Sequence, residues 1–124
     1  MEVFSKSDIG LVRTQNQDDC RFGVISPSCV WAVVCDGMGG ANGGNIASAT
    51  AVEYISTKIV DLYKEDMTKE QISELMVEIV ANANVKIFEL AAHDPELAGM
   101  GTTCEFVFVK DTTVHVVHVG DSRT

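Results

Sequence analysis

The chain has 124 residues, of which 46% are hydrophobic and 22% are charged, and its formal net charge is -9. This length and composition predict one soluble globular domain with a moderate core. The acidic balance argues against nucleic acid or an anionic membrane surface as a partner. The sequence also holds no run near the roughly 20 apolar residues that a membrane span needs.

The amino-terminal residues and the cysteines indicate an intracellular protein. No apolar stretch follows the first basic residue, Lys6, so we predict no signal peptide. The four cysteines show no CxxC spacing, and at least Cys35 and Cys104 lie in apolar runs. We therefore expect reduced core thiols and a cytoplasmic location.

The first third of the chain predicts strands separated by polar turns. The predicted segments are an edge-like strand over residues 2–7, a polar loop over 11–19, a strand over 20–25 and a buried strand over 30–35. The buried strand carries no charge and ends at Asp36, where Gly37 and the glycines after it permit a sharp turn. Because the last two strands are joined by a short turn, we expect Arg13 and Asp18 of the polar loop to lie near Asp36.

The middle of the chain predicts two long amphipathic helices. Apolar residues recur at helical spacing over 45–63, and again from Ile72 to Ala91, and both stripes are expected in the core. The first stripe comprises Ile46, Ala49, Val52, Ile55, Ile59, Leu62 and Tyr63. Thr68 and Gln71 fit a capping box at the start of the second helix, which His93-Asp94-Pro95 ends. Two such helices in succession are expected to pack antiparallel over one face of a sheet.

The last part of the chain predicts a β-hairpin, with strands over 104–109 and 113–119. Phe106 and Phe108 point to one face, and Val107 and Val109 point to the other. Since both faces are apolar, both need a covering layer. The helices can supply one layer, and a second sheet could supply the other.

The histidines do not predict a metal site. His115 and His118 are three residues apart on a predicted strand, so their side chains point to opposite faces. His93 lies at a helix end, where a cationic side chain interacts favourably with the helix dipole.

If Arg13, Asp18, Asp36 and Asp121 lie close together in the fold, they could form a site for metal ions and a phosphoryl group. The Asp36 carboxylate and the Gly37 carbonyl are hard oxygen ligands, which suit Mg²⁺ or Mn²⁺ rather than zinc. One carboxylate can bridge two ions roughly 3.5 to 4 Å apart, and water held there becomes a nucleophile at neutral pH. Arg13 could bind a phosphoryl group through paired hydrogen bonds. Together these residues predict a site for the metal-assisted hydrolysis of a phosphoester.

Four motifs then resemble a known family, the metal-dependent serine/threonine protein phosphatases of type 2C, also called PPM. The motifs are Arg13-Thr14-Gln15-Asn16-Gln17-Asp18, Asp36-Gly37-Met38-Gly39-Gly40, Gly101-Thr102-Thr103 and Val119-Gly120-Asp121-Ser122-Arg123. Their order and gaps are similar to those of the compact bacterial members. Those members act on phosphoserine and phosphothreonine, opposite serine/threonine kinases.

The resemblance implies a fold and a role for each matching residue. The fold is α+β, the N-terminal half of an α-β-β-α sandwich with a two-metal centre at one end of the paired sheets. Asp36 would bridge the two metals and the Gly37 carbonyl would bind the second. Asp18 would hold metal-bound waters, Arg13 the substrate phosphate, and Asp121 a third, weaker metal.

The chain also departs from the family pattern. Gln17 stands where many relatives carry Glu, and the later Asp-Gly and Asp-Asn that supply further metal carboxylates are absent. We therefore expect residues 1–124 to be a partial catalytic domain that hydrolyses little alone and self-associates through uncovered sheet. The alternatives are an inactive relic or a half-domain that acts as an interaction module. A P-loop is disfavoured, because no Gly-Lys-Ser/Thr follows the glycines.

Overall fold

The computed structural model describes residues 18–38, 43–97 and 99–119. The elements in chain order are β1 (Asp18–Ser26), β2 (Cys29–Met38), α1 (Gly43–Leu62), α2 (Lys69–His93), a 3₁₀ turn η1 (Pro95–Leu97), β3 (Gly101–Thr102), β4 (Cys104–Lys110) and β5 (Thr113–Val119). The strands pair antiparallel in the order β1-β2-β4-β5, and β3 pairs with the end of β2. The predicted α+β class is confirmed, and the predicted strand over 2–7 lies outside the described residues.

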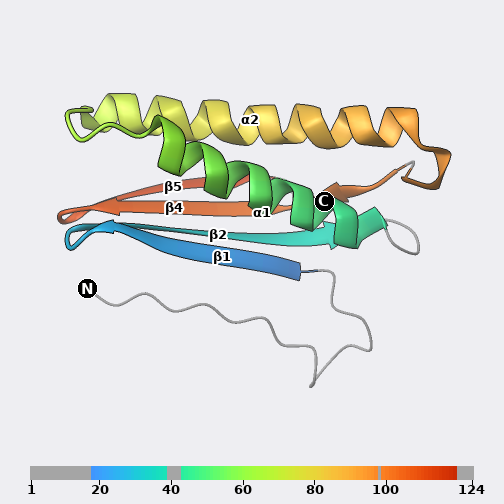
Figure 1. Cartoon of the computed structure of the whole chain (residues 1–124), viewed down its shortest axis with the longest axis horizontal. Coiled ribbons are helices and arrows are strands. Elements are labelled where there is room, and N and C mark those ends of the chain that lie inside the picture. Colours follow the sequence, from blue (N-terminus) through green and yellow to red (C-terminus); the bar gives the residue numbers. More distant parts are fainter. Residues whose placement is uncertain (1–17, 39–42, 98, 120–124) are drawn as a thin grey trace, which may run out of the picture.

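Both helices lie on one face of the sheet and run in opposite directions (Figure 1). The buried side chains of the strands point to this face, and they include Trp31, Val33, Phe106 and Phe108. Trp31 packs its indole over Gly23 of β1, where a Cβ would approach the ring to 2.7 Å. The predicted alternation of Phe106 and Phe108 is confirmed, but the prediction of a buried strand over 30–35 is wrong in part, because Val34 is 46% exposed on the opposite face.

Helix α1 lies close to the sheet because small residues form much of its inner face. Gly44, Ala47, Ser48 and Ala51 are buried there, followed by larger residues such as Ile55. Short side chains let a helix backbone approach its neighbour closely, which the predicted stripe of larger residues did not anticipate. Ile46 and Leu62, expected inside, are instead exposed.

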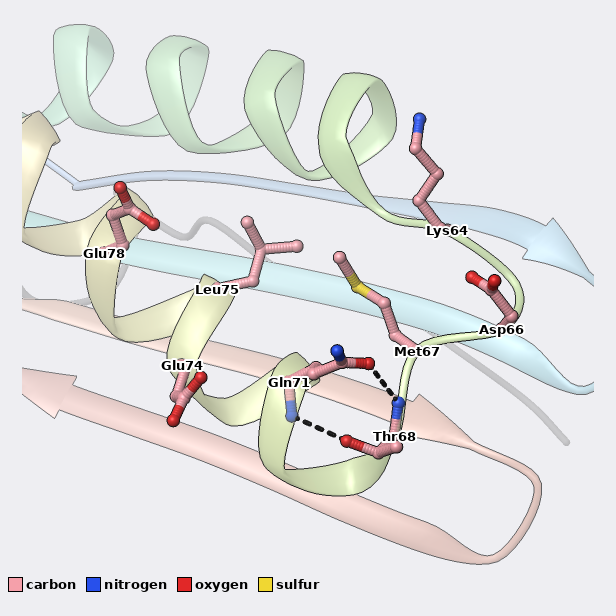
Figure 2. A pocket seen from close by; sticks show the side chains of 8 residues that line it. All are labelled: Lys64, Asp66, Met67, Thr68, Gln71, Glu74, Leu75 and Glu78. Atoms are coloured by element: carbon pink, nitrogen blue, oxygen red, sulfur yellow. Dashed lines mark hydrogen bonds between the residues drawn. The ribbon is translucent and has the colours of Figure 1, made fainter.

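Helix α2 begins with the predicted capping box, which is visible in Figure 2. The Gln71 N–H donates to Thr68 Oγ1 at 3.1 Å, and the Thr68 N–H donates to Gln71 Oε1 at 2.9 Å. Such a cap stabilises a helix by about 1 kcal/mol. At the other end, His93 Nδ1 lies 2.8 Å from the Glu89 carbonyl oxygen, in keeping with its predicted place at a helix terminus.

The face of the sheet opposite the helices is apolar and exposed. Val34, Val114 and Val116 lie on it, together with Phe22 and Val24 of β1, the end strand of the sheet among the described residues. No helix or strand of the described ranges covers this face. Neither α1 nor α2, in the part of the chain that the structure describes, is long and apolar enough to cross a membrane.

Candidate metal centre

The C-terminal end of β2 brings three of the sequence motifs together. Asp18, the first residue of β1, pairs with Asp36, and on the other side of β2 Gly37 pairs with Thr102 of β3. The predicted proximity of Asp18 and Asp36 is therefore correct. Asp18 itself was expected in a loop, but it lies in β1, because the antiparallel pairing extends to the end of β2.

Backbone hydrogen bonds hold Asp36 against the Gly-Thr-Thr segment. The Thr103 N–H donates to the Asp36 carbonyl at 3.0 Å, and the Asp36 N–H donates to Thr103 Oγ1 at 3.3 Å. The Asp36 residue is exposed between buried Cys35 and Gly37, so it lies on the sheet face away from the helices. A solvent-accessible carboxylate on a fixed backbone can take up a cation.

Gly37 is a point of close contact between the sheet and α1. A Cβ at this position would lie 1.9 Å from the Gly44 carbonyl oxygen in the first turn of α1. The turn predicted directly after Asp36 is wrong, since β2 continues to Met38. Gly37 is required for this contact rather than for a left-handed backbone; among the described glycines only Gly99 has a positive φ, of 83°.

Two buried thiols lie beneath this end of the sheet. Cys35 and Cys104 are almost fully buried, as predicted, and their side chains form a hydrogen bond. The hydrogen bond with Cys104 and the burial of the thiol raise the pKa of Cys35 well above its usual value. The same hydrogen bond lowers the pKa of Cys104, but both thiols are almost fully buried and therefore not accessible to a substrate as nucleophiles.

The donor types fit a hard divalent cation, but the described residues do not form a complete ligand set. Asp36 offers a carboxylate and Gly37 a carbonyl oxygen, which are ligands of Mg²⁺ and Mn²⁺. Within residues 18–38, 43–97 and 99–119, no three His, Cys, Asp or Glu side chains gather closely enough to hold a metal. Arg13 and Asp121, the other predicted site residues, lie outside the described residues.

A separate cavity of about 650 Å³ lies at the opposite end of the sheet, beside the connection between α1 and α2 (Figure 2). Its charged lining residues are Lys64, Asp66, Glu74 and Glu78. None of the four motifs contributes to it. The cavity is therefore not part of the candidate metal centre.

Comparison with known proteins identifies the family. Residues 12–124 match the family model described as protein phosphatase 2C. The chain belongs to the protein phosphatase 2C family. Among the relatives, protein phosphatase PhpP of Streptococcus pneumoniae is 35% identical over 123 residues, which cover 99% of this chain and 49% of that protein. Serine/threonine phosphatase stp of Listeria monocytogenes is 31% identical over 126 residues, covering 99% and 48%.

Solved structures give the same family and the same coverage. The structure of the S. agalactiae serine/threonine phosphatase matches with a TM-score of 0.79 and 34% identity, covering 95% of this chain and 48% of that one. A bacterial serine phosphatase matches with a TM-score of 0.80 and 27% identity, covering 95% and 47%. This protein phosphatase 2C chain thus spans about half the length of the relatives it matches.

One residue of the candidate site was missed by the sequence reasoning. Thr103 belongs to a recognised motif, but no role was predicted for it. Its contact with Asp36 joins residues 67 positions apart in the chain. Only the register of β2 against β3 and β4 reveals the contact, and the spacing of the motifs carries no signal for it.

The histidines of this protein phosphatase 2C family member are separated as predicted. His115 faces α2 with only 8% of its surface exposed, and its Nδ1 lies 3.1 Å from Ser73 Oγ. His118 lies on the exposed face of the sheet, opposite the helices, and its Nδ1 forms a hydrogen bond with Glu105 Oε1. The two side chains cannot share a metal ion.

The buried His115 should make stability depend on pH. Burial, and then the positive charge of Lys69, lower the pKa of His115 from its ordinary value of 6.5. His115 takes up a proton more readily in the unfolded chain than in the folded one. The contribution of neutral His115 to the free energy of unfolding is therefore full above about pH 6.5 and is lost as pH falls below that value. Urea unfolding should give a lower free energy at about pH 5 than at about pH 7.

Two variants isolate the effect of His115. His115→Gln should flatten the pH dependence between those values, whereas Asn82→Gln, at an exposed position of α2 that does not titrate, should leave it as in the wild type. An unchanged slope in His115→Gln would contradict the assignment.

Proposed function

We propose that this chain is the N-terminal half of a catalytic domain that hydrolyses phosphoserine and phosphothreonine in proteins with Mn²⁺ or Mg²⁺. The observation that carries the proposal is the meeting of Asp18, Asp36 and the Gly-Thr-Thr segment at one end of the sheet, in a protein phosphatase 2C chain. Names of the relatives include serine/threonine phosphatases, which supports a phosphoprotein substrate.

Each predicted residue has a role in this proposal. Asp36 and the Gly37 carbonyl bind the metal ions, of which the complete domain holds two or three. Bound at these residues, the metal would provide activation of a water molecule as a nucleophile at neutral pH. Asp18 orients water beside Asp36, Arg13 binds the substrate phosphate, and Asp121 contributes to the additional metal.

The remaining carboxylate ligands come from outside this chain in the proposal. Two facts support this: the described residues offer no cluster of three ligands, and the chain spans 49% of a relative that it matches. The substrates are phosphoproteins, the targets of a serine/threonine kinase. Nucleic acid and membranes are not proposed as partners, given the formal net charge of -9.

The test compares two proteins in the hydrolysis of a phosphothreonine peptide. One is this chain alone, and the other is the chain joined to the C-terminal half of a protein phosphatase 2C relative. We expect hydrolysis by the joined protein only with Mn²⁺ or Mg²⁺, and at least about 100-fold less by the chain alone, since an incomplete ligand set weakens metal binding. Equal specific activity of the two would overturn the half-domain proposal.

The exposed sheet face favours a second candidate, an interaction module that associates with a second copy of itself. The centre of this face is formed by uncharged apolar residues on β1, β2, β4 and β5, among them Val34, Val107 and Val116. Glu105 and His118 on the same face contact each other, so a second copy of the chain could cover the apolar centre without covering an isolated charge there. Apolar patches of this kind commonly mark interaction surfaces.

A pair of matched valines tests self-association. Val116 on the open face is 54% exposed, and Val77 on the outer side of α2 is 56% exposed. In sedimentation velocity, Val116→Lys should shift the chain to monomer, because the substitution places a charge in the apolar interface, and Val77→Lys should not. A wild-type chain that stays monomeric at all concentrations would contradict this candidate.

A further inference from the structure

Thr103 lies between β3 and β4, directly opposite Asp36. Gly37 pairs with Thr102 and Val34 pairs with Glu105, so the continuous register sets Thr103 against Asp36. In an antiparallel sheet, two residues at a hydrogen-bonded position exchange two N–H···O=C bonds. Here the Thr103 N–H makes the expected bond to the Asp36 carbonyl, at 3.0 Å.

The second bond of this pair goes to a side chain. The Asp36 N–H donates to Thr103 Oγ1 at 3.3 Å, and the same oxygen lies 3.5 Å from the Asp36 carbonyl oxygen. The Thr103 carbonyl instead accepts a bond from Thr102 Oγ1 at 2.8 Å. The Thr103 hydroxyl, rather than the Thr103 carbonyl, thus accepts the bond from the Asp36 N–H. At this position the partner of β2 changes from β4 to β3.

This arrangement restrains the Asp36 backbone at both of its polar groups. On the following residue, Gly37 packs against the Gly44 backbone, so the peptide between Asp36 and Gly37 is held from two sides. The Asp36 carboxylate branches from the chain just before that peptide, and the Gly37 carbonyl follows just after it. Substituting a group that orients a metal ligand typically lowers metal affinity by about 10- to 100-fold.

We propose that Thr103 is a positioning residue, whose hydroxyl holds Asp36 so that its carboxylate and the Gly37 carbonyl face one metal ion. The inference rests on the proposed function, because it assumes that Asp36 and Gly37 bind metal. Thr103 itself touches neither the metal nor the substrate. Its effect is on the direction of the ligands, and a merely structural role would instead appear in stability alone.

Substitutions that separate the hydroxyl from the rest of Thr103 test the proposal. Thr103→Val removes the hydroxyl and keeps the shape, and Thr103→Ser keeps the hydroxyl and removes the methyl group. Thr113→Val makes the same change as Thr103→Val at the other end of the sheet, opposite Lys110. Because the Asp36 N–H is at an exposed site, water can replace the lost bond, and Thr103→Val should fold.

The measurement is the broadening of backbone amide signals of the ¹⁵N-labelled chain by paramagnetic Mn²⁺, together with the thermal midpoint of each variant. In the wild type, the signals of Asp36 and Gly37 should broaden first. Thr103→Val should need about tenfold more Mn²⁺ for the same broadening, the lower end of the effect of ligand-orienting groups. Thr103→Ser and Thr113→Val should respond as the wild type does.

The outcomes separate this inference from the proposed function. Equal Mn²⁺ response in Thr103→Val and wild type overturns the positioning role and leaves the metal site in place. No broadening at Asp36 in the wild type overturns the metal site of this chain, and the inference with it. If Thr103→Val does not fold, Thr103→Ala gives the same comparison: weaker broadening supports the inference and an unchanged response overturns it.

Discussion

The Gly37→Ala variant should lose about 3 kcal/mol or more of its free energy of unfolding, at the upper end of what overpacking costs. The added Cβ would lie 1.9 Å from the Gly44 carbonyl oxygen and 2.5 Å from the Gly44 carbonyl carbon. Both are backbone atoms in the first turn of α1, so no side-chain rotation can relieve the overlap. The start of the helix must move away from β2, and urea unfolding measures the loss.

Gly101→Ala is the matched control for this variant. Gly101 lies on β3 beside the same end of β2, but the nearest atom to its added Cβ is Met38 Cγ, at an ordinary 3.8 Å. Its stability should stay within about 0.5 kcal/mol of the wild type, as for most substitutions without a specific conflict. Equal losses in the two variants would mean that the contact between Gly37 and Gly44 does not determine how α1 packs.

The Asp36→Asn variant should bind Mn²⁺ at least about 100-fold more weakly, since even groups that only orient a ligand cost roughly 10- to 100-fold. The amide keeps the shape of the carboxylate but removes its charge and half of its capacity as a metal ligand. Because residue 36 is exposed, the change should leave the unfolding midpoint nearly unchanged. In the protein extended to a complete domain, phosphatase activity should fall with the affinity.

Asp61→Asn controls for the loss of one negative charge. Asp61 is an exposed residue in the last turn of α1, remote from the end of β2. Mn²⁺ affinity, measured by isothermal titration calorimetry, should match the wild type in Asp61→Asn. A similar affinity for Mn²⁺ in both variants would show that Asp36 is not a ligand.

The sheet and its helices could be predicted because local patterns coincide with tertiary packing. Phe106 and Phe108 alternate with Val107 and Val109, and the structure places the two pairs on opposite faces. The capping box at Thr68 also depends on neighbouring residues alone. In each case the information lies within a few positions of the chain.

The errors concern elements that depend on contacts between distant residues. Helix α1 begins at Gly43, two residues before the predicted start, although glycine is a poor helix former. The backbone of Gly44 in this first turn approaches Gly37 so closely that a Cβ at residue 37 would overlap it, a contact between distant residues that the local pattern does not reveal. Strand β3 has two residues, too few for any periodic signal, and it forms because the extended end of β2 offers unpaired backbone groups.

The candidate site could be predicted in part for the same reasons. The prediction that a short turn joins two antiparallel strands correctly placed Asp18 next to Asp36. The bonds from Thr103 to Asp36 could not be foreseen, because they require the exact register between segments 67 positions apart. The roles of Arg13 and Asp121 stay predictions, since both lie outside the described residues.

The position of a bound metal ion tests the central claim most directly. Crystals of the chain grown with Mn²⁺ would show the ion by its anomalous scattering. We expect the strongest anomalous peak beside the Asp36 carboxylate and the Gly37 carbonyl oxygen, at the end of β2. A peak only at the distant cavity lined by Asp66, Glu74 and Glu78, or no peak near Asp36, would contradict the account.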